Sequence, residues 1–204
     1  NTMTVYISSG TGSGQLRTIS DYVGSTKVAT VSSDWTTNPD NTSDYEVRGT
    51  GNATVINASG LNFAASSVGG ALSATATAGD MIQSGALTIK GASALTTLAN
   101  NGTITLDITE VSGTAVANEF TGALTITTND DDGGADADVT IDGGTTKLII
   151  ATSTIDGDLT LRTGNADDTS GITDTGPVTV VGNLSVTNDV DNGDIDMGSL
   201  TVTG

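Results

Sequence analysis

Residues 122–126, Gly-Ala-Leu-Thr-Ile, are one of eight close copies of a short motif. The motif places a turn residue and a small or polar spacer before an apolar residue, a hydroxyl residue and a second apolar residue. This alternation is typical of a strand with one buried face. The middle apolar residues recur about every nineteen residues, and the other copies lie at 85–89, 102–106, 137–141, 157–161, 176–180, 182–186 and 198–202.

Repeats of about 20 residues are too short to bury their own apolar face, so they predict a coil of stacked strands. We therefore expect an all-β fold: a β-solenoid (parallel β-helix) of about seven rungs in residues 51–204, preceded by a small β module in residues 1–50. Only Phe120 is aromatic after residue 63, which favours a thin aliphatic interior. In such a column Leu124, Val139, Leu159 and Val178 share one core.

The charge of the chain limits its partners. The 204 residues carry a net charge of −18 with six basic side chains, so nucleic acid and anionic membranes are excluded as expected partners. No apolar run is long enough to predict membrane insertion. Of the 24 acids 21 are Asp, which favours turns over helices, so we expect the acidic residues in loops and little helix.

The first fifty residues predict strands at 4–8, 15–23, 26–31 and 43–47. Their distinctive runs are Ser9-Gly-Thr-Gly-Ser-Gly-Gln-Leu-Arg-Thr-Ile-Ser-Asp-Tyr22, Thr26-Lys-Val-Ala-Thr-Val31, Trp35-Thr-Thr-Asn-Pro-Asp40 and Ser43-Asp-Tyr45. These runs resemble a β module of phage virion proteins and large surface proteins. The resemblance implies a structural spacer without catalytic residues. That family usually has another strand before the position of Met3, which this sequence does not supply.

The remainder of the chain resembles the β-helical repeats of secreted adhesins of the filamentous-haemagglutinin type. The shared features are the rung length and the pattern Gly-x-Leu-x-Val/Ile, as in Gly157-Asp-Leu-Thr-Leu161. This resemblance implies an extended β-helical rod outside the cell.

Two acidic runs raise a metal hypothesis, because calcium prefers carboxylate and carbonyl oxygen ligands. The candidate ligands are Asp130, Asp131 and Asp132 in one run and Asp189, Asp191 and Asp194 in the other. Neither run has the spacing of an EF-hand loop. The alternative is that both runs are solvated acidic loops that keep the protein soluble.

Two other functions are alternatives to a structural one. Asp156 and Asp158 could act as an acid–base pair on a polysaccharide, but close acid pairs arise by chance in so acidic a chain, so we expect no enzyme. Most motif copies have threonine between their two apolar residues. These threonines could form an outward ladder that binds a flat lattice such as ice, or they could be present only because threonine favours β-strands. They are Thr88, Thr105, Thr125, Thr140, Thr160, Thr179 and Thr201.

The last residues, Leu200-Thr-Val-Thr-Gly204, repeat the motif and contain no cap. Either the sequence is an excerpt of a longer protein, or neighbouring subunits complete its ends by strand addition. We therefore predict a structural subunit of an extracellular filament, sheath or surface layer that assembles head-to-tail with copies of itself. The alternative is a receptor- or glycan-binding segment of a phage fibre or adhesin. Either function places the protein at a cell surface, outside the cell or in a virion.

Overall fold

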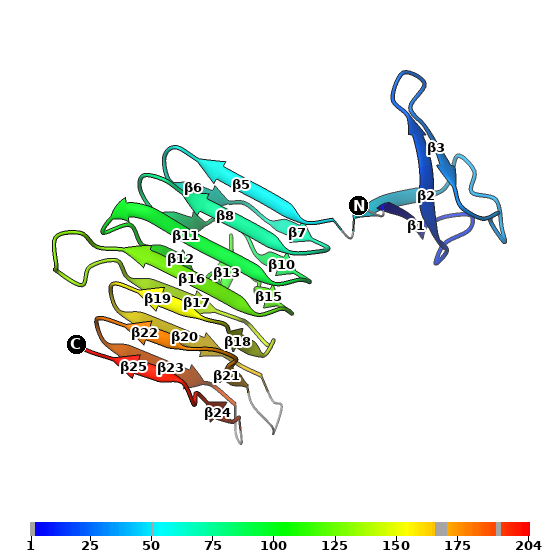
Figure 1. The fold of residues 1–204 in the computed structure, drawn as a ribbon. Helices are drawn as coiled ribbons and strands as arrows, with labels where there is room; N and C mark the ends of the chain where they lie inside the picture. The colour runs from blue at the N-terminus through cyan, green and yellow to red at the C-terminus, as the bar shows by residue number, and fades with distance from the viewer. Residues whose placement is uncertain (1–2, 50, 166–170, 191–192) are drawn as a thin grey trace. The chain divides into compact units, whose positions relative to one another are not determined.

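The computed structural model describes residues 3–49, 51–165, 171–190 and 193–204. It divides into two compact units, Asn1–Asn52 and Ala53–Gly204 (Figure 1). All regular structure in the described residues is β-strand, which confirms the predicted fold class. None of the described segments forms a helix with the length and hydrophobicity that a bilayer crossing requires.

The first unit is a four-stranded antiparallel sheet in the order β3-β2-β1-β4. Gln15 secures the loop beside it: its amide nitrogen donates to the carbonyl of Thr37 at 2.7 Å, and its oxygen accepts from the backbone of Thr36 at 2.8 Å. The Arg17 guanidinium lies over the Trp35 ring, 5.2 Å from its centroid. The strands are β1 (Met3–Ser9), β2 (Leu16–Val23), β3 (Val28–Val31) and β4 (Asp44–Gly49).

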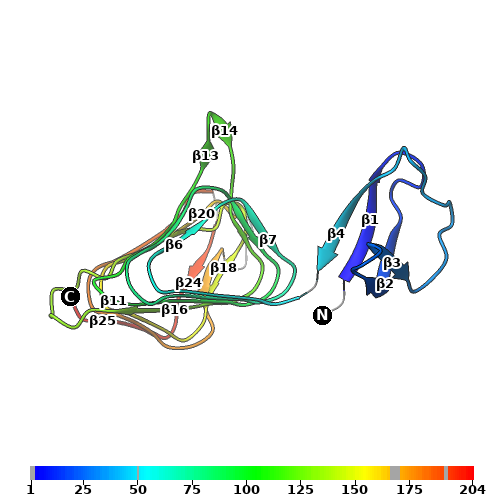
Figure 2. The same ribbon diagram turned by 90° about the horizontal axis from the view of Figure 1, so that it is seen from above.

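The second unit is a β-solenoid with three sides, which we number in chain order (Figures 1 and 2). Face 1 consists of β5 (Ala53–Asn57), β8 (Leu72–Ala76), β11 (Ser93–Asn100), β16 (Leu124–Asn129), β19 (Ser153–Ile155), β22 (Val178–Val180) and β25 (Leu200–Val202). Face 2 consists of β6 (Leu61–Phe63), β9 (Met81–Gln83), β12 (Ile104–Leu106), β17 (Val139–Asp142), β20 (Leu159–Thr163) and β23 (Leu184–Asn188).

Face 3 is built in two parts. The first part is a separate three-stranded sheet, and the second part joins face 1 at β16 through the pairing of Leu124 with Ile150. The six strands of face 2 correspond to six rungs, and face 1 has a seventh strand, so the expected seven rungs are nearly reached. Face 3 contains β7 (Ser66–Val68), β10 (Leu87–Ile89), β15 (Glu119–Phe120), β18 (Leu148–Ile150), β21 (Ile172–Asp174) and β24 (Ile195–Asp196).

The predicted aliphatic core is confirmed. Leu124, Val139, Leu159 and Val178 are at most 1% exposed and belong to one continuous cluster. Phe120 is also buried in this cluster. The inward residues of all three faces meet in the same narrow interior. Period-two alternation therefore buries one side of a strand on whichever face the strand lies.

The strands stack as expected, but the motif copies are distributed over all three faces. The copy at 85–89 lies on face 3, the copy at 122–126 lies on face 1, and the copies at 137–141 and 157–161 are neighbours on face 2. Residues that do stack on face 2 are Leu61, Met81, Ile104, Val139, Leu159 and Leu184, whose separations range from 20 to 35 residues.

The threonines at the shared motif position also separate: Thr88 lies on face 3, Thr105 on face 2 and Thr125 on face 1. The register nevertheless builds a different continuous ladder on face 1, in which each member pairs with the next. Its members are Thr75, Thr96, Thr127, Thr154, Thr179 and Thr201. Thr75, Thr96, Thr127, Thr154 and Thr179 alternate with buried residues and therefore face outward, and Thr201 continues their register on β25.

The corners require glycine because the backbones of successive rungs touch there. A Cβ at Gly122 would overlap the backbone of Gly91, and a Cβ at Gly157 would overlap the backbone of Ala137. Both glycines stand directly before a spacer and a motif strand, so the turn residue of the motif reflects this close approach.

We predict that Leu159→Ala lowers the free energy of unfolding of the solenoid by about 2–5 kcal/mol, because it leaves a cavity that the neighbouring rungs cannot fill. The adjacent outward variant Thr160→Ala should cost less than about 1 kcal/mol. Urea denaturation followed by circular dichroism measures both. Equal losses would contradict the assignment of inward and outward residues.

Candidate functional site

The acidic loop that follows β16 is organised by Asp130. Its Oδ1 accepts hydrogen bonds from the backbone of Asp132 at 3.0 Å and Gly133 at 3.2 Å, and its Oδ2 accepts from Ala135 at 2.6 Å. Loss of contact with water by itself would raise the pKa of Asp130. The hydrogen bonds from the loop outweigh this effect and leave the pKa below its ordinary value.

The other two acids of this run are exposed and do not converge on a common centre with Asp130. Asp132 Oδ2 accepts hydrogen bonds from the side-chain amides of Asn100 at 3.0 Å and Asn101 at 3.3 Å. Among the residues that the structure describes, no three acids are grouped in a way that could hold a metal ion. The calcium site at Asp130, Asp131 and Asp132 stays a prediction.

The second acidic run is placed only in part. Asp189 forms an ion pair with Arg162. Asp194 is exposed, and its backbone carbonyl accepts a hydrogen bond from Gly171 at 2.8 Å. Asp191 lies outside the described residues. Calcium binding by Asp189, Asp191 and Asp194 therefore stays a prediction.

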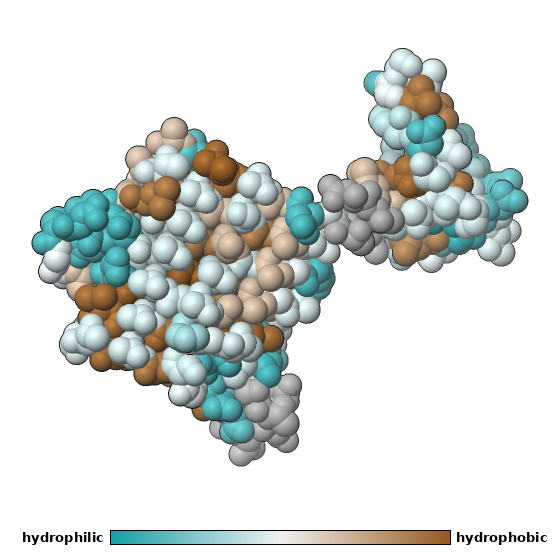
Figure 3. Space-filling view, viewed as in Figure 1, coloured by the Kyte–Doolittle hydropathy of each residue, from teal (hydrophilic) through white to brown (hydrophobic). Residues whose placement is uncertain are grey.

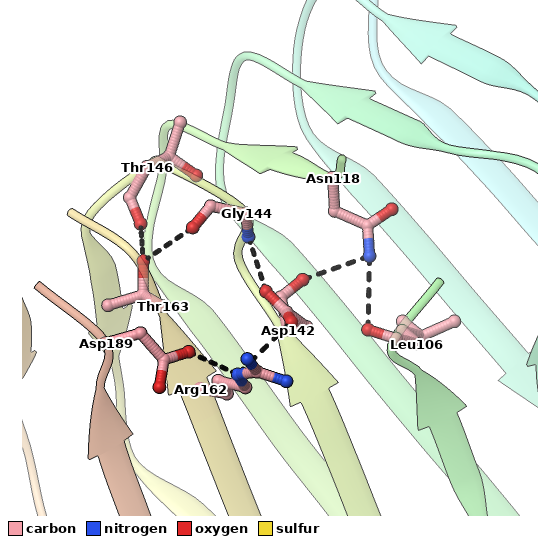
Figure 4. A network of polar contacts seen from close by, with 8 residues as sticks. All are labelled: Leu106, Asn118, Asp142, Gly144, Thr146, Arg162, Thr163 and Asp189. Atoms are coloured by element: carbon pink, nitrogen blue, oxygen red, sulfur yellow. Dashed lines mark hydrogen bonds and ion pairs between the residues drawn. The ribbon is translucent and has the colours of Figure 1, made fainter. Parts of the chain in front are cut away.

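Arg162 links two rungs on the outer side of face 2 (Figure 4). It pairs with Asp189 and lies 3.9 Å from Oδ2 of Asp142, which is only 8% exposed. The hydrogen bond from Arg162 to Asp189 and the charges of both acids raise the pKa of the guanidinium above its ordinary value. Asp142 also accepts a hydrogen bond from the backbone of Gly144 at 2.7 Å.

A buried amide connects three rungs at the adjoining corner. Asn118 is 2% exposed, and its Nδ2 donates to the carbonyls of Leu106 at 3.1 Å and Asp142 at 3.0 Å (Figure 4). Its Oδ1 accepts from the backbone of Leu87 at 2.9 Å and from the Gln83 amide at 2.9 Å. Asn118 thus joins the ends of β9, β12 and β17.

Asn118 lies three residues after an inserted hairpin, β13 (Glu110–Val111) and β14 (Thr114–Ala115), which stands out from the solenoid (Figure 2). Sequence reasoning missed both the hairpin and its anchor. The available signal was the long separation between Ile104 and Val139, because an insertion at a corner lengthens one rung without disturbing its strands.

At the corner before face 2, aspartate side chains form hydrogen bonds with the backbone of the following rung. Oδ1 of Asp80 accepts from the backbone of Thr103 at 2.9 Å, and Oδ1 of Asp138 accepts from Asp158 at 2.8 Å. Asp158 Oδ1 in turn accepts from the backbone of Asn183 at 2.6 Å. These carboxylates satisfy backbone donors that the turn leaves without a ladder partner.

Asp156 and Asp158, the candidate catalytic pair, lie at the same corner. Asp156 Oδ2 accepts a hydrogen bond from the backbone of Asp130 at 3.3 Å, while Asp158 bonds to the following rung. The two carboxylates thus contact rungs on opposite sides of their own. Catalysis by this pair stays an untested hypothesis.

A shallow hollow lies near the last rung and is lined by Thr173, Asp174, Thr175, Gly176, Asp196, Gly198 and Ser199. Asp174 forms part of its wall, where Oδ1 accepts from the backbone of Gly198 at 2.7 Å and Oδ2 accepts from Ser199 at 3.0 Å. Both oxygens of Asp174 therefore connect rungs, as the other corner aspartates do.

Comparison with known proteins adds one finding. Residues 50–127 match a family described as repeats of unknown function (DUF5649). Neither the comparison with curated proteins nor the comparison with solved structures returns a match. The match supports the repeat character of the solenoid, whereas the resemblances to phage modules and haemagglutinin-type adhesins stay predictions.

We predict that Asp130→Ala lowers the melting temperature by the same amount in calcium and in chelator, because the carboxylate already accepts hydrogen bonds from its own loop. Differential scanning calorimetry of both proteins in the two media measures this. A stabilisation of the native protein by calcium that the variant loses would instead support the calcium site.

We predict that Asn118→Ala costs about 2–5 kcal/mol of stability, because it leaves the buried backbone groups of Leu87, Leu106 and Asp142 without their partner. Asn183→Ala, at an exposed position, is the matched control and should cost less than about 1 kcal/mol. Denaturation midpoints compare the two. A mild effect of Asn118→Ala would show that water replaces the amide.

Proposed function

We propose that this chain is a structural subunit of an extracellular filament, sheath or surface layer, and that copies join head-to-tail by strand addition. A β-solenoid of repeats is compatible with a structural or adhesin-like role. The observation that supports assembly is the continuous stacking of rungs, because a strand added to β25 would continue the same hydrogen-bonded ladder. The proposal assigns the chain no catalytic activity and no membrane insertion.

The edge of β25 carries unpaired backbone groups on its outer side. β22 and β25 are joined by bonds from Val178 to the carbonyl of Ser199 at 2.8 Å and from Thr203 to the carbonyl of Val180 at 3.0 Å. Alternation along the strand then directs the amides and carbonyls of Leu200 and Val202 away from β22. An edge of this kind is a template for another strand.

Apolar side chains accompany this edge. Leu200 is 36% exposed and Val202 is 41% exposed, although their counterparts on β22 are buried. At the first rung β8 is the one ladder partner of β5 among the described strands. A head-to-tail contact between these ends would continue all three faces, and repetition of that contact produces a filament.

We predict that Val202→Pro shortens or abolishes the filaments, because proline removes an outward amide donor and sparing Thr201 and Thr203 preserves the bonds to β22. Val202→Thr is the matched control and should assemble as the native chain does. Negative-stain electron microscopy and sedimentation velocity measure filament length. Native chains that stay monomeric at high concentration, or Val202→Pro filaments of normal length, would contradict the proposal.

The inserted hairpin favours a second candidate function: a receptor- or glycan-binding segment of a phage fibre or adhesin. A hairpin that projects from a rigid rod and is anchored by a buried amide suits ligand presentation. Replacing residues 109–116 with Gly-Ser should abolish binding to cells or glycan arrays without changing the far-ultraviolet circular dichroism. Binding that survives this replacement would reject the hairpin as the binding element.

A further inference from the structure

We infer that the solenoid contains a built-in hinge, at which faces 3 and 1 separate between two successive turns of the coil while face 2 stays closed. The two segments that separate are residues 119–130 and residues 146–156, which lie one turn apart. We call the boundary between them the seam. The motion takes place within one chain and does not depend on the assembly proposed above.

The backbone ladder is interrupted at the seam. On face 3, β15 and β18 are one turn apart, yet no ladder pair joins these two described strands. On face 1, Leu124 of β16 pairs with Ile150 of β18. The next pair joins Thr127 to Thr154 of β19, so two residues on β16 face three residues on the opposite segment. The extra residue disrupts the ladder in the manner of a β-bulge.

Hydroxyl side chains accept backbone amides at the points where the ladder is interrupted. The amide of Phe120 donates to Oγ1 of Thr146 at 3.2 Å, on face 3. The amide of Ile126 donates to Oγ of Ser153 at 3.0 Å, on face 1. A hydroxyl bridges the seam only in one rotamer, so a side-chain rotation breaks such a bond without displacing either backbone.

Side chains also hold the end of the seam, beside the acidic loop of residues 130–136. The amide of Asp156 donates to Oγ1 of Thr128 at 2.9 Å, and Asp156 Oδ2 accepts from the amide of Asp130 at 3.3 Å. The loop is a strongly hydrophilic projection at the margin of face 1 (Figure 3). This end of the seam therefore lies next to solvent, where water can replace the side-chain contacts.

The boundaries on either side of the seam are joined through the backbone on the same two faces. One turn earlier, the amide of Thr121 donates to the carbonyl of Ile89 at 2.9 Å, and β11 pairs with β16 at every residue from 93 to 96. One turn later, the amide of Thr175 donates to the carbonyl of Ile150 at 2.8 Å, and β19 pairs with β22 along its whole length. Opening at the seam thus breaks fewer backbone bonds than opening at either neighbouring boundary.

Face 2 holds the coil together at both ends of the seam and forms the hinge. β17 pairs with β12 before the seam begins and with β20 after it ends, in both cases without interruption. Asn118 reinforces the first of these contacts, because its Nδ2 bridges the carbonyls of Leu106 and Asp142. Separation of faces 3 and 1 is therefore a rotation about face 2.

Opening of the hinge exposes a defined part of the core. The buried side chains at the seam are Phe120, Leu124, Ile126, Ile150 and Ile155, each at most 1% exposed. Exposure of this apolar surface to water is unfavourable, so the closed state predominates. The hinge lets the rod bend toward face 2 by a local opening, without global unfolding.

Two buried serines form a matched pair for testing the hinge. Ser153 and Ser93 each begin a strand of face 1, and both are at most 3% exposed. Oγ of Ser153 accepts from Ile126 and donates to the carbonyl of Ala151 at 2.8 Å. Oγ of Ser93 has no hydrogen-bond partner within the described structure. Removal of the hydroxyl should therefore loosen the seam at Ser153 and leave it unchanged at Ser93.

Hydrogen exchange of the native chain, followed amide by amide with NMR, measures the opening. The amides of Phe120 and Ile126 should exchange at least tenfold faster than that of Ser93, whose acceptor is the backbone carbonyl of Ala123. Ser153→Ala should accelerate exchange of the Ile126 amide at least fivefold, and Ser93→Ala should change it less than twofold. Equal exchange at the three amides, or no effect of Ser153→Ala, would overturn the inference.

A disulfide across the seam tests whether the two faces open together. The chain contains no cysteine, so Thr127→Cys with Thr154→Cys creates one defined bridge between paired residues. Oxidation should slow exchange at least tenfold at Ile126 on face 1 and also at Phe120 on face 3, and reduction should restore it. Thr96→Cys with Thr127→Cys bridges the boundary above the seam and is the matched control, which should change both amides less than twofold.

The outcome at Phe120 separates a hinge from local fraying. Slower exchange at Ile126 alone would show that each amide opens independently, and it would overturn the inference. Rapid exchange that persists at both amides in the oxidised Thr127–Thr154 variant would overturn it as well.

Discussion

The hydrogen-bonded ladder between successive rungs is the constraint on which the rest of the solenoid depends. Parallel strands about 4.8 Å apart leave no space for side chains where the backbone turns a corner. This explains why Gly122 touches Gly91 and why Gly157 touches Ala137. The interior between the three faces is filled by aliphatic side chains and the one fully buried aromatic of the described residues, Phe120.

The period-two pattern predicted the strands and their buried residues because it reports burial without reference to a particular face. It could not predict which face each motif copy occupies. Leu124 and Leu159 have the same place in the motif, yet one lies on face 1 and the other on face 2. That choice depends on the length of the corners, and the inserted hairpin shows that a corner can lengthen freely.

The acidic residues illustrate a second limit of sequence reasoning. Runs of aspartate suggest a shared ligand for their carboxylates, because residues close in sequence are assumed to act together. In the structure Asp80, Asp138 and Asp158 each bind a backbone amide of the following rung, about 20 or more residues further along the chain. These partners are adjacent only after the rungs have stacked, as are the partners of Asn118.

The distribution of charge and of unpaired backbone gives the solenoid two different kinds of open surface. In the assembly proposed above, a strand added to β25 would continue the ladder, so that contact would extend the rod in one direction. The strands of face 1 contain no charged residue, so a contact across that face would depend on side chains and lie at right angles to the first. Faces 2 and 3, by contrast, contain acids within their strands, Asp142 on face 2 and Asp174 on face 3 among them. A rod with these two surfaces is suited to a layer or bundle in which longitudinal and lateral contacts are chemically independent.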